Sequence, residues 1–185
     1  MKVKLKEVAQ VVVSLPQLAV ENEIIAKWFK SSDFLINNEV QQAELDDKFK
    51  VNDIFNVRVG DIVIKRIAPT YINVIDEEYL DTYYGANIVI IRSDINKVEN
   101  GYLACVLNWQ ISRLTTATAL PSINKKELDE LVIDLPPLET QVKIAKLWRL
   151  IQEKNRLYLK LMELSKLKEK YIFSKVMKVG EKTNG

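Results

Sequence analysis

Residues 134–178 read DLPPLETQVKIAKLWRLIQEKNRLYLKLMELSKLKEKYIFSKVMK, and this stretch decides the architecture of the chain. The 41 residues after Pro137 contain neither glycine nor proline. Proline is tolerated at the first helical position because the N–H that it lacks would have no partner there. Glu139 near the start and several lysines near the end complement the helix dipole. The stretch therefore predicts one helix over 138–178, about 60 Å long.

The helix carries a heptad pattern of apolar residues. With Leu147 at position a, six of the eight a and d positions up to Tyr171 are apolar, and most e positions are apolar as well. We call the predicted contact residues the apolar stripe: Leu147, Leu150, Ile151, Leu157, Tyr158, Leu161 and Leu164.

Two interpretations of the stripe are open. A long helix often belongs to the core of its own domain. We favour a coiled coil between chains or repeats, because the rest of the chain is too short to cover the stripe. Lys154 and Lys168 occupy a positions, where each would face its own copy in a parallel pair, and they favour an antiparallel pair.

Composition excludes several classes of site. The chain has 185 residues, a single cysteine (Cys105, within an apolar run) and no histidine. These counts exclude a disulfide framework, the usual zinc sites and a histidine-based catalytic triad. No apolar run has the length of a membrane span and no cleavable signal opens the sequence, so we expect a protein of the reducing cytoplasm.

Charge is distributed unevenly. Residues 138–178 hold 11 Lys and Arg against 4 Asp and Glu, whereas residues 1–137 hold 15 against 20. A basic helix commonly has a solvated face, and it can also contact phosphates, a membrane or an acidic partner. An acidic balance over residues 1–137 is not what a domain that binds nucleic acid typically shows.

Residues 1–137 alternate short apolar runs with turn signals. Gly60-Asp61 predicts a turn before a strand over 62–66, and a strand over 71–75 can form a hairpin with it. Asn124 and Glu127 have capping-box spacing and predict a short helix. The other expected elements are a turn then a buried strand over 3–15, a strand over 24–29, a loop or short helix over 43–54, a strand over 86–92, a helix over 99–113, a loop over 115–122 and a strand over 131–135. This order predicts an α+β domain with a mixed β-sheet followed by one long C-terminal helix.

The junction at Leu135-Pro136-Pro137-Leu138, with Gln141, Ile144 and Ala145 after it, resembles the specificity subunits of type I restriction-modification systems. The likeness extends to VKLKEVA at 3–9, GDIVI at 60–64 and GYL at 101–103, and covers roughly 1–14 and 57–178. The sequence departs from the family at Thr140, where glutamate is usual, and over 15–56.

The resemblance implies a target recognition domain over 1–137, a coiled-coil spacer helix over 138–178 and a disordered tail over 179–185. Complete subunits of the family carry two such domains and two antiparallel helices, so it implies a half-subunit or a truncated one. The expected function is sequence-specific binding to one half of a bipartite target in double-stranded DNA. Separate methyltransferase and endonuclease subunits would be directed to that site, and two copies would form a homodimer through the apolar stripe.

DNA contacts are expected from cationic, amide and hydroxyl side chains on loops at the edge of the sheet. Lys65 and Arg66 end a predicted strand, and solvated charge is the alternative for them. Asn87 is expected to be a strand amide, with a contact to adenine as the alternative. Small residues allow close approach to phosphate, and lysines near a helix N-terminus attract anions. The candidate DNA-binding residues are Lys65, Arg66, Arg113, Thr115, Thr116, Thr118, Lys125 and Lys126.

No catalytic, cofactor or metal site is expected. The carboxylates Asp61, Asp76, Glu77 and Glu78 are interpreted as solvated, because they lack the lysine spacing and strand context of a metal-dependent nuclease. None of the five glycines forms a phosphate-binding GxG motif. The alternative function is a coiled-coil DNA-binding adaptor or regulator outside a restriction system.

Overall fold

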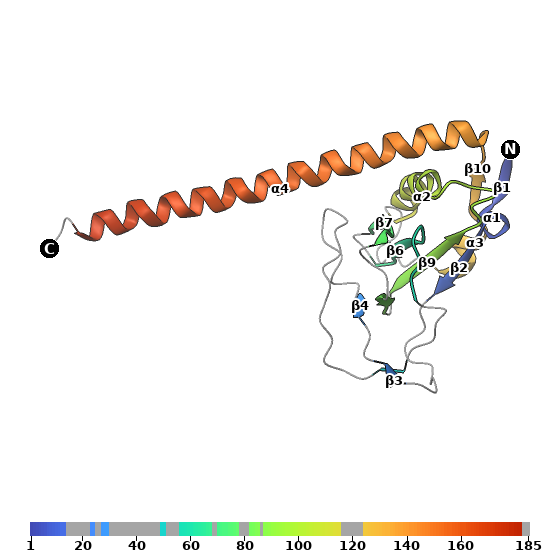
Figure 1. The fold of residues 1–185 in the computed structure, drawn as a ribbon, viewed down its shortest axis with the longest axis horizontal. Coiled ribbons are helices and arrows are strands. Elements are labelled where there is room, and N and C mark those ends of the chain that lie inside the picture. The colour runs from blue at the N-terminus through green and yellow to red at the C-terminus, as the bar shows by residue number, and fades with distance from the viewer. Residues whose placement is uncertain are drawn as a thin grey trace. The chain divides into compact units, whose positions relative to one another are not determined.

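The computed structural model describes residues 1–13, 23–24, 27–29, 49–50, 56–67, 70–77, 82–85, 87–115 and 124–182. The chain divides into two compact units, Met1–Trp148 and Arg149–Gly185, and each is described by itself. The first unit contains all the strands (Figure 1). The second consists of the greater part of one helix.

A four-stranded antiparallel sheet forms the centre of the first unit. Its order is β2 (Ala9–Val13), β9 (Ile88–Ser93), β6 (Ile62–Lys65) and β7 (Ile72–Val74). The two inner strands are almost continuously apolar, which is typical of strands buried on both faces.

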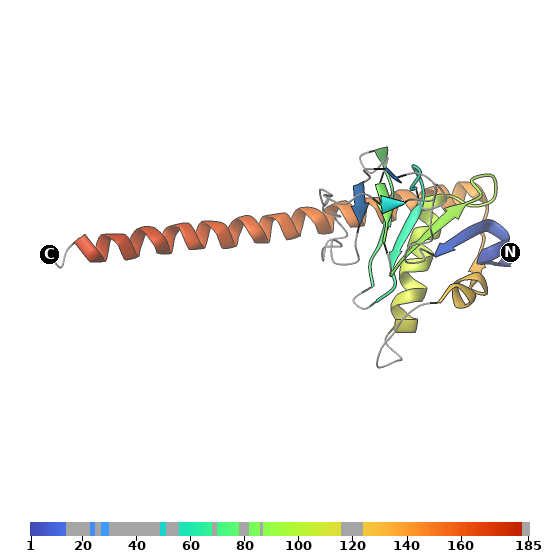
Figure 2. The same cartoon turned by 90° about the horizontal axis from the view of Figure 1, so that it is seen from below.

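Alternate residues of these strands enter two separate apolar clusters, as the period of two along a strand requires. Helix α2 (Asn100–Thr115) lies against one face (Figure 2), where its Leu103 and Leu107 pack with Ile62, Ile64 and other residues of the sheet. The opposite face buries Val12, Val63, Ile88 and Ile90 with Val57, Ile75 and Tyr84.

The turn before β6 requires a glycine. Gly60 has φ +87°, and its N–H donates to Ile75 O at 2.8 Å. A Cβ at this position would lie 2.3 Å from Asn100 Nδ2. Only glycine adopts this backbone without a steric cost, so the turn signal at Gly60-Asp61 has a physical basis.

A second, two-stranded sheet joins the first residues of the chain to residues 132–134. Strand β1 (Lys2–Lys4) pairs antiparallel with β10 (Val132–Asp134), and the Leu135 N–H donates to Met1 O at 2.7 Å. Two short helices adjoin these strands in the chain: α1 (Leu5–Val8) follows β1, α3 (Lys125–Asp129) precedes β10, and the two helices contact each other. The capping box predicted from Asn124 and Glu127 is confirmed: the Glu127 N–H donates to Asn124 Oδ1 at 2.9 Å, and the Asn124 N–H donates to Glu127 Oε2 at 3.1 Å.

The long helix α4 (Leu138–Lys182) begins directly after Pro137 and is anchored by Gln141. This side chain is 3% exposed. Its Oε1 accepts from the Glu99 N–H at 3.0 Å, and its Nε2 donates to Pro136 O at 2.9 Å. Ala145 and Trp148 continue the buried face of this first part of α4. Gln141 therefore ties the start of α4 to the start of α2.

Four very short strands complete the described elements. β3 (Glu23–Ile24) pairs antiparallel with β5 (Phe49–Lys50), and β4 (Lys27–Phe29) pairs parallel with β8 (Thr82–Tyr84). The prediction of a loop or short helix over 43–54 is wrong at Phe49–Lys50, where strand pairing with a distant segment decides the conformation.

The predicted fold class, an α+β domain with a mixed sheet and a long C-terminal helix, is confirmed. The predicted 62–66 and 71–75 hairpin is present as β6 and β7. Asn87 is not a strand amide: its φ is +69°, in the turn before β9, a conformation that asparagine tolerates better than most residues. The long helix ends at Lys182 rather than at 178, and the last three residues of the predicted tail lie outside the described residues.

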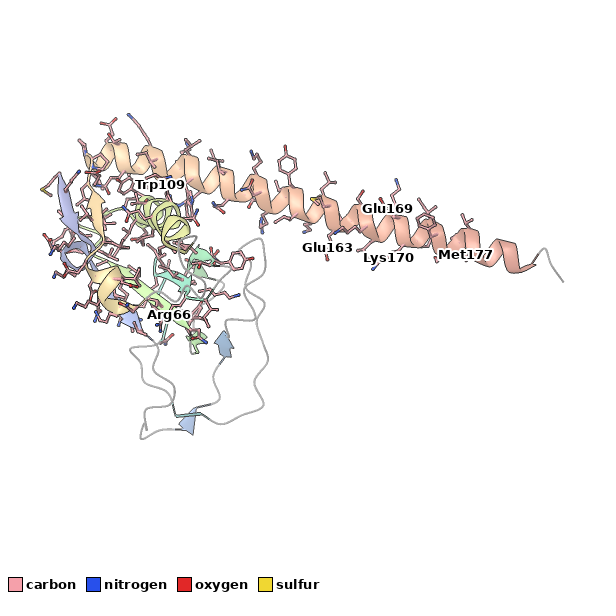
Figure 3. All side chains as sticks on the ribbon, turned by 180° about the vertical axis from the view of Figure 1, so that it is seen from behind. Arg66, Trp109, Glu163, Glu169, Lys170 and Met177 are labelled. Atoms are coloured by element: carbon pink, nitrogen blue, oxygen red, sulfur yellow. The ribbon has the colours of Figure 1, made fainter. Side chains whose placement is uncertain are left out.

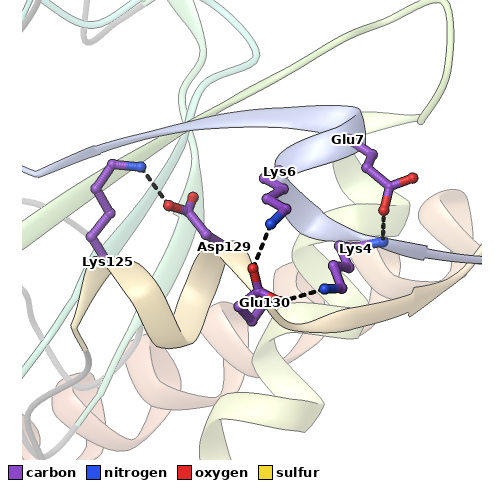
Figure 4. Close-up of polar contacts among 6 residues, drawn as sticks. All are labelled: Lys4, Lys6, Glu7, Lys125, Asp129 and Glu130. Atoms are coloured by element: carbon purple, nitrogen blue, oxygen red, sulfur yellow. Dashed lines mark hydrogen bonds and ion pairs between the residues drawn. The ribbon is translucent and has the colours of Figure 1, made fainter.

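An ion-pair cluster joins the elements around β1 and α3 (Figure 4). Glu130 Oε2 lies 2.6 Å from Lys4 Nζ, and its Oε1 lies 2.5 Å from Lys6 Nζ. The hydrogen bonds from Lys4 and Lys6 lower the pKa of Glu130 from its ordinary 4.5 to about 2. The cluster connects α3 to the first residues of the chain.

The cluster predicts a pH-dependent contribution to stability. A carboxyl whose pKa is lower in the folded state contributes stability above its unfolded pKa, and this contribution is lost as pH falls through the folded pKa. We expect Glu130→Gln to lower the melting temperature at pH 7 and the difference from wild type to shrink between pH 4.5 and 2. Calorimetry across this range checks it, with Glu169→Gln on α4 as control. A constant difference at all pH values would contradict the assignment.

Candidate nucleic-acid interface

One end of the four-stranded sheet gathers three chain connections. Here β2 ends at Val13 and β6 ends at Lys65, while β9 begins at Ile88. The pairs Val13–Val89 and Lys65–Ile88 place these positions side by side. We call this end of the sheet the Lys65 end. The opposite end, where Ala9 of β2 pairs with Ser93 of β9, is called the Ala9 end. Connections at a sheet end are the usual place for binding residues.

Lys65 and Arg66 are held at this end by the backbone. The Lys65 N–H donates to Tyr71 O at 2.9 Å, and the Arg66 N–H donates to Asn87 O at 2.8 Å. Lys65 Nζ lies 5.5 Å from the centroid of the Tyr71 ring, within range of a cation–π interaction. Both cationic side chains are half-buried, and Figure 3 labels Arg66 on the sheet side of the molecule. These hydrogen bonds hold the backbone of Lys65, the last residue of β6, and of Arg66 directly after it.

Charge differs between the two ends of the sheet. Among the described residues 13, 65–67, 70–72 and 87–88 at the Lys65 end, the charged ones are Lys65 and Arg66. The Ala9 end and the connections beside it hold charges of both signs. The carboxylates are Glu7, Asp61, Asp76, Glu77, Asp94 and Asp129, and the cations include Lys6, Arg58, Arg92, Lys97 and Lys125. The acidic balance of residues 1–137 thus does not extend to the described residues at the Lys65 end.

The Ala9 end carries a groove of about 560 Å³. Its charged lining residues are five cations and three carboxylates: Lys6, Arg58, Arg92, Lys97, Lys125, Glu7, Asp94 and Asp129. Lys125 Nζ is paired with Asp129 at 2.6 Å, and Lys97 Nζ with Asp94 at 3.2 Å. A phosphate entering this groove would compete with carboxylates already in place, which makes it less suited to DNA than the Lys65 end.

The structure does not bring all the predicted DNA-binding residues together. Lys125 and its exposed neighbour Lys126 begin α3, which packs on β2 near the Ala9 end, so β9 separates them from Lys65 by about 20 Å. Arg113 and Thr115 lie in the last turn of α2, but their side chains are outside the described residues, as are Thr116 and Thr118 entirely. Lys97 and Arg58 of the groove carried no sequence signal, because only the fold places them beside Lys125.

The interpretation of Asp61 as a solvated carboxylate is wrong, because this residue is 4% exposed. Its Oδ2 accepts from the Arg58 N–H at 2.9 Å and from Arg92 Nε at 3.2 Å. Burial raises the pKa of Asp61 above its ordinary value, against the hydrogen bond from Arg58 and the charge of Arg92. Asp76 and Glu77, in contrast, are exposed as expected. Among the described residues, no group of three or more His, Cys, Asp and Glu side chains has the arrangement of a metal site.

The apolar stripe of α4 is exposed along its length, from Leu147 to Leu164. Leu147 is 60% exposed, whereas the neighbouring Trp148 is 8% exposed, so the face of α4 that packs into the first unit is not the face that carries the stripe. Glu163, Glu169 and Lys170 in Figure 3 mark the course of this helix. No helix in the described part of the chain is long and apolar enough to span a membrane.

Comparison with known families gives one match. Residues 1–161 match the family described as Type I restriction modification DNA specificity domain. This match covers the four-stranded sheet, both short helices and the first half of α4. No curated protein sequence matches the chain.

The chain is similar in fold to chains of three solved structures. A chain from a structure concerned with complex assembly and conformational transition of the type I R-M system has a TM-score of 0.64 and 22% identity. The HsdS subunit from Thermoanaerobacter tengcongensis has a TM-score of 0.58 and 25% identity, and the type I S subunit from M. genitalium has 0.54 and 16%. The similarity covers 85%, 85% and 86% of this chain but only 39%, 38% and 41% of those chains. The chain thus spans about two fifths of their length.

Proposed function

Because the chain belongs to the type I restriction modification DNA specificity domain family, we propose that it reads one half of a bipartite target in double-stranded DNA. In this proposal the chain supplies sequence specificity to separate methyltransferase and endonuclease subunits and carries out no catalysis itself. The family match over residues 1–161 is the observation that carries the proposal.

The proposed DNA contact lies at the Lys65 end of the sheet. Support comes from charge: the described charged residues at this end, Lys65 and Arg66, are cationic, and phosphate neutralisation supplies much of the affinity for DNA. Their fixed backbone positions would also orient the adjacent connections toward base edges. The predicted contacts of Arg113, Thr115, Thr116, Thr118, Lys125 and Lys126 stay separate proposals, to be tested by single substitutions.

We further propose that two copies pair antiparallel through the apolar stripe of α4. The support is an exposed stripe of leucines that a single copy does not cover in the described structure. Rows of exposed apolar residues on this scale mark interaction surfaces. Such a pair would present two recognition domains related by a two-fold axis, and its target would be a palindromic split site.

Methylation mapping in cells with and without this chain, with the methyltransferase subunit present, tests the proposed function. We expect a split motif whose methylation depends on the chain, with two halves related by inversion. A non-palindromic split motif would contradict the two-fold pair and leave the specificity function standing. Methylation that is independent of the chain would contradict the specificity function itself and favour a regulator.

Removal of the two cations at the Lys65 end should weaken DNA binding. We expect Lys65→Ala with Arg66→Ala to lower affinity about 10- to 100-fold at 0.15 M salt, because two phosphate contacts are lost. The slope of log affinity against log salt concentration should fall by about 2, one for each contact. Titration of a fluorescent duplex at several salt concentrations measures both.

The matched control is Lys2→Ala with Lys146→Ala, which removes the same charge from two exposed positions elsewhere in the first unit. This control should change the salt slope little. Equal effects of the two double variants would show that only the net charge of the domain matters, and would remove the proposed interface from the Lys65 end.

A further inference from the structure

We infer that the two copies of α4 pair in a single register, with the two-fold axis between Asn155 and Arg156, so that Glu153 of each copy lies against Lys160 of the other. This inference rests on the helix pairing proposed above and specifies its partner surface residue by residue. It follows from three observations: which face of the helix is free, where the lysines lie in the heptad, and which register brings opposite charges together.

The free face is defined by the first part of α4. Gln141, Ala145 and Trp148 are buried on one side of the helix. At 100° per residue, Leu147 and Leu150 lie about 120 to 180° around the helix from the mean direction of those three. The exposed fractions agree, at 60% for Leu147 and 59% for Leu150. A second helix can therefore lie along the apolar stripe without displacing the contacts that anchor α4.

Heptad positions decide the direction of the second helix. In a parallel pair, a positions face each other, so Lys154 and Lys168 would each meet their own copy in the core. The flanking pairs would then join Glu153 to Tyr158 and Lys160 to Ser165, with no opposite charges. In an antiparallel pair, a positions face d positions, which are leucine or tyrosine here from Leu150 to Tyr171. The antiparallel direction therefore removes the contact of Lys154 with its own copy at the centre of the core.

Charge then selects the register. Antiparallel helices bring g positions together, and the g positions here include Glu153 and Lys160. With the axis between Asn155 and Arg156, each Glu153 meets a Lys160 of the second copy. If one helix moves by a heptad, the axis lies either at Gln152 or at Leu159. With the axis at Gln152, Glu153 meets Glu153 of the second copy; with the axis at Leu159, Lys160 meets Lys160. Moving it by two heptads toward the C-terminus leaves Lys160 against Leu167, with no charge pair. Moving it by two heptads toward the N-terminus places Glu153 against Lys146, but it sets Lys154 against Lys143 in the core and leaves Leu161 and Leu164 beyond the start of the second copy's α4.

The core layers of this register are mostly leucine. Leu147 lies opposite Leu164, and Leu150 lies opposite Leu161, each twice by symmetry. Lys154 lies opposite Leu157, where its methylene stem can pack while the ammonium group extends to solvent. At the flanks Ile151 meets Tyr158. The least favourable layer places Lys168 opposite Lys143 toward the two ends of the pair, where solvent screens the repulsion.

Glu153 is already held in a defined position. Its carboxylate accepts from Arg156 Nε at 2.9 Å and from Arg156 Nη2 at 2.8 Å within the same helix, and its side chain stays 48% exposed. Arg156 occupies position c, on the side of the helix away from the stripe, and thus does not block the g position. A carboxylate has lone pairs for a further donor, so Lys160 of the second copy can join this pair.

Crosslinking of paired cysteines tests the register in the full chain, with Cys105 replaced by serine. We expect Leu150→Cys with Leu161→Cys to form covalent dimers rapidly with a short bismaleimide. Leu150→Cys with Lys168→Cys, which matches the axis at Leu159, should react at least tenfold more slowly, because registers differ by about 10 Å in helix translation. Faster reaction of the second variant would overturn the register and leave the pairing intact.

Charge reversal gives an independent measurement. At low salt we expect Glu153→Lys and Lys160→Glu each to raise the dimer dissociation constant about tenfold, because each creates two like-charge contacts. The double variant Glu153→Lys with Lys160→Glu should return to within about threefold of wild type. Lys166→Glu at position f is the control and should have little effect. Failure of the double variant to recover would overturn the inference, and a monomer at all concentrations would overturn the pairing as well.

Discussion

The double substitution Leu157→Lys with Leu161→Lys is expected to convert a homodimer into a monomer. Burial of one leucine contributes about 1.5 to 3 kcal/mol, and a symmetric pair loses four of them. A loss of about 6 kcal/mol raises the dissociation constant by about four orders of magnitude. In the register inferred above, the new lysines would also face Lys154 and Leu150 of the second copy. Light scattering across a range of protein concentrations measures the outcome.

The control for this substitution carries the same added charge on another face of α4. Met162 and Phe173 are exposed apolar residues at positions b and f, away from the apolar stripe. We expect Met162→Lys with Phe173→Lys to leave the dimer intact, and the circular dichroism of both double variants to stay near that of wild type. An unchanged dimer for Leu157→Lys with Leu161→Lys would reject the stripe as the contact surface.

Local signals account for what the sequence predicted well. The absence of glycine and proline after Pro137 sufficed for α4, and the spacing of Asn124 and Glu127 sufficed for α3. Gly60 marked its turn because the backbone there needs a positive φ. These features depend on residues within a few positions of one another, and a single sequence shows such dependence directly.

Pairing between residues far apart in the chain accounts for the features that the sequence did not predict. The β1–β10 sheet joins Lys2 to Asp134, residues that carry no signal for each other in the sequence. The strands at Phe49–Lys50 and Thr82–Tyr84 are too short to show a period, and their partners lie far away in the chain. The pair of Asp61 with Arg92 bridges 31 positions, so the residues next to Asp61 in the sequence give no sign that its carboxylate is buried.

The candidate DNA-binding residues show the same limit, because the sequence does not give their distances from one another. Lys65 and Arg66 are candidates from the sequence because they end an apolar strand, and the structure places them at a sheet end where three connections meet. Lys125 and Lys126 are candidates because they begin a helix, which gives no information on their distance from Lys65. The separation of these groups depends on strand order, which the apolar pattern of the four strands does not encode.

The largest expected effect on stability comes from Arg92→Met. The Arg92 side chain is 11% exposed and contacts the Asp61 carboxylate, whose side chain is 5% exposed. Removal of Arg92 leaves the buried Asp61 carboxylate with the Arg58 N–H but without its cationic partner, and breaking a buried ion pair in this way typically costs 3 to 5 kcal/mol. Methionine fills the space of the aliphatic stem, so little of the loss should come from packing. We expect the free energy of unfolding in urea at pH 7 to fall by about 3 kcal/mol.

The pH dependence of this variant separates charge from packing. Burial already raises the pKa of Asp61 above 3.8, and loss of Arg92 removes charge and hydrogen bonding that lower it. A carboxyl whose folded pKa is raised contributes full stability below its unfolded pKa and loses it as pH rises through the folded value. The deficit of Arg92→Met relative to wild type should therefore shrink as pH falls toward 4. Asp61→Asn added to Arg92→Met should recover at least half of the deficit at pH 7, because no buried charge then lacks a partner. A deficit that is unchanged by both pH and Asp61→Asn would assign the loss to packing and contradict the role of the charge pair.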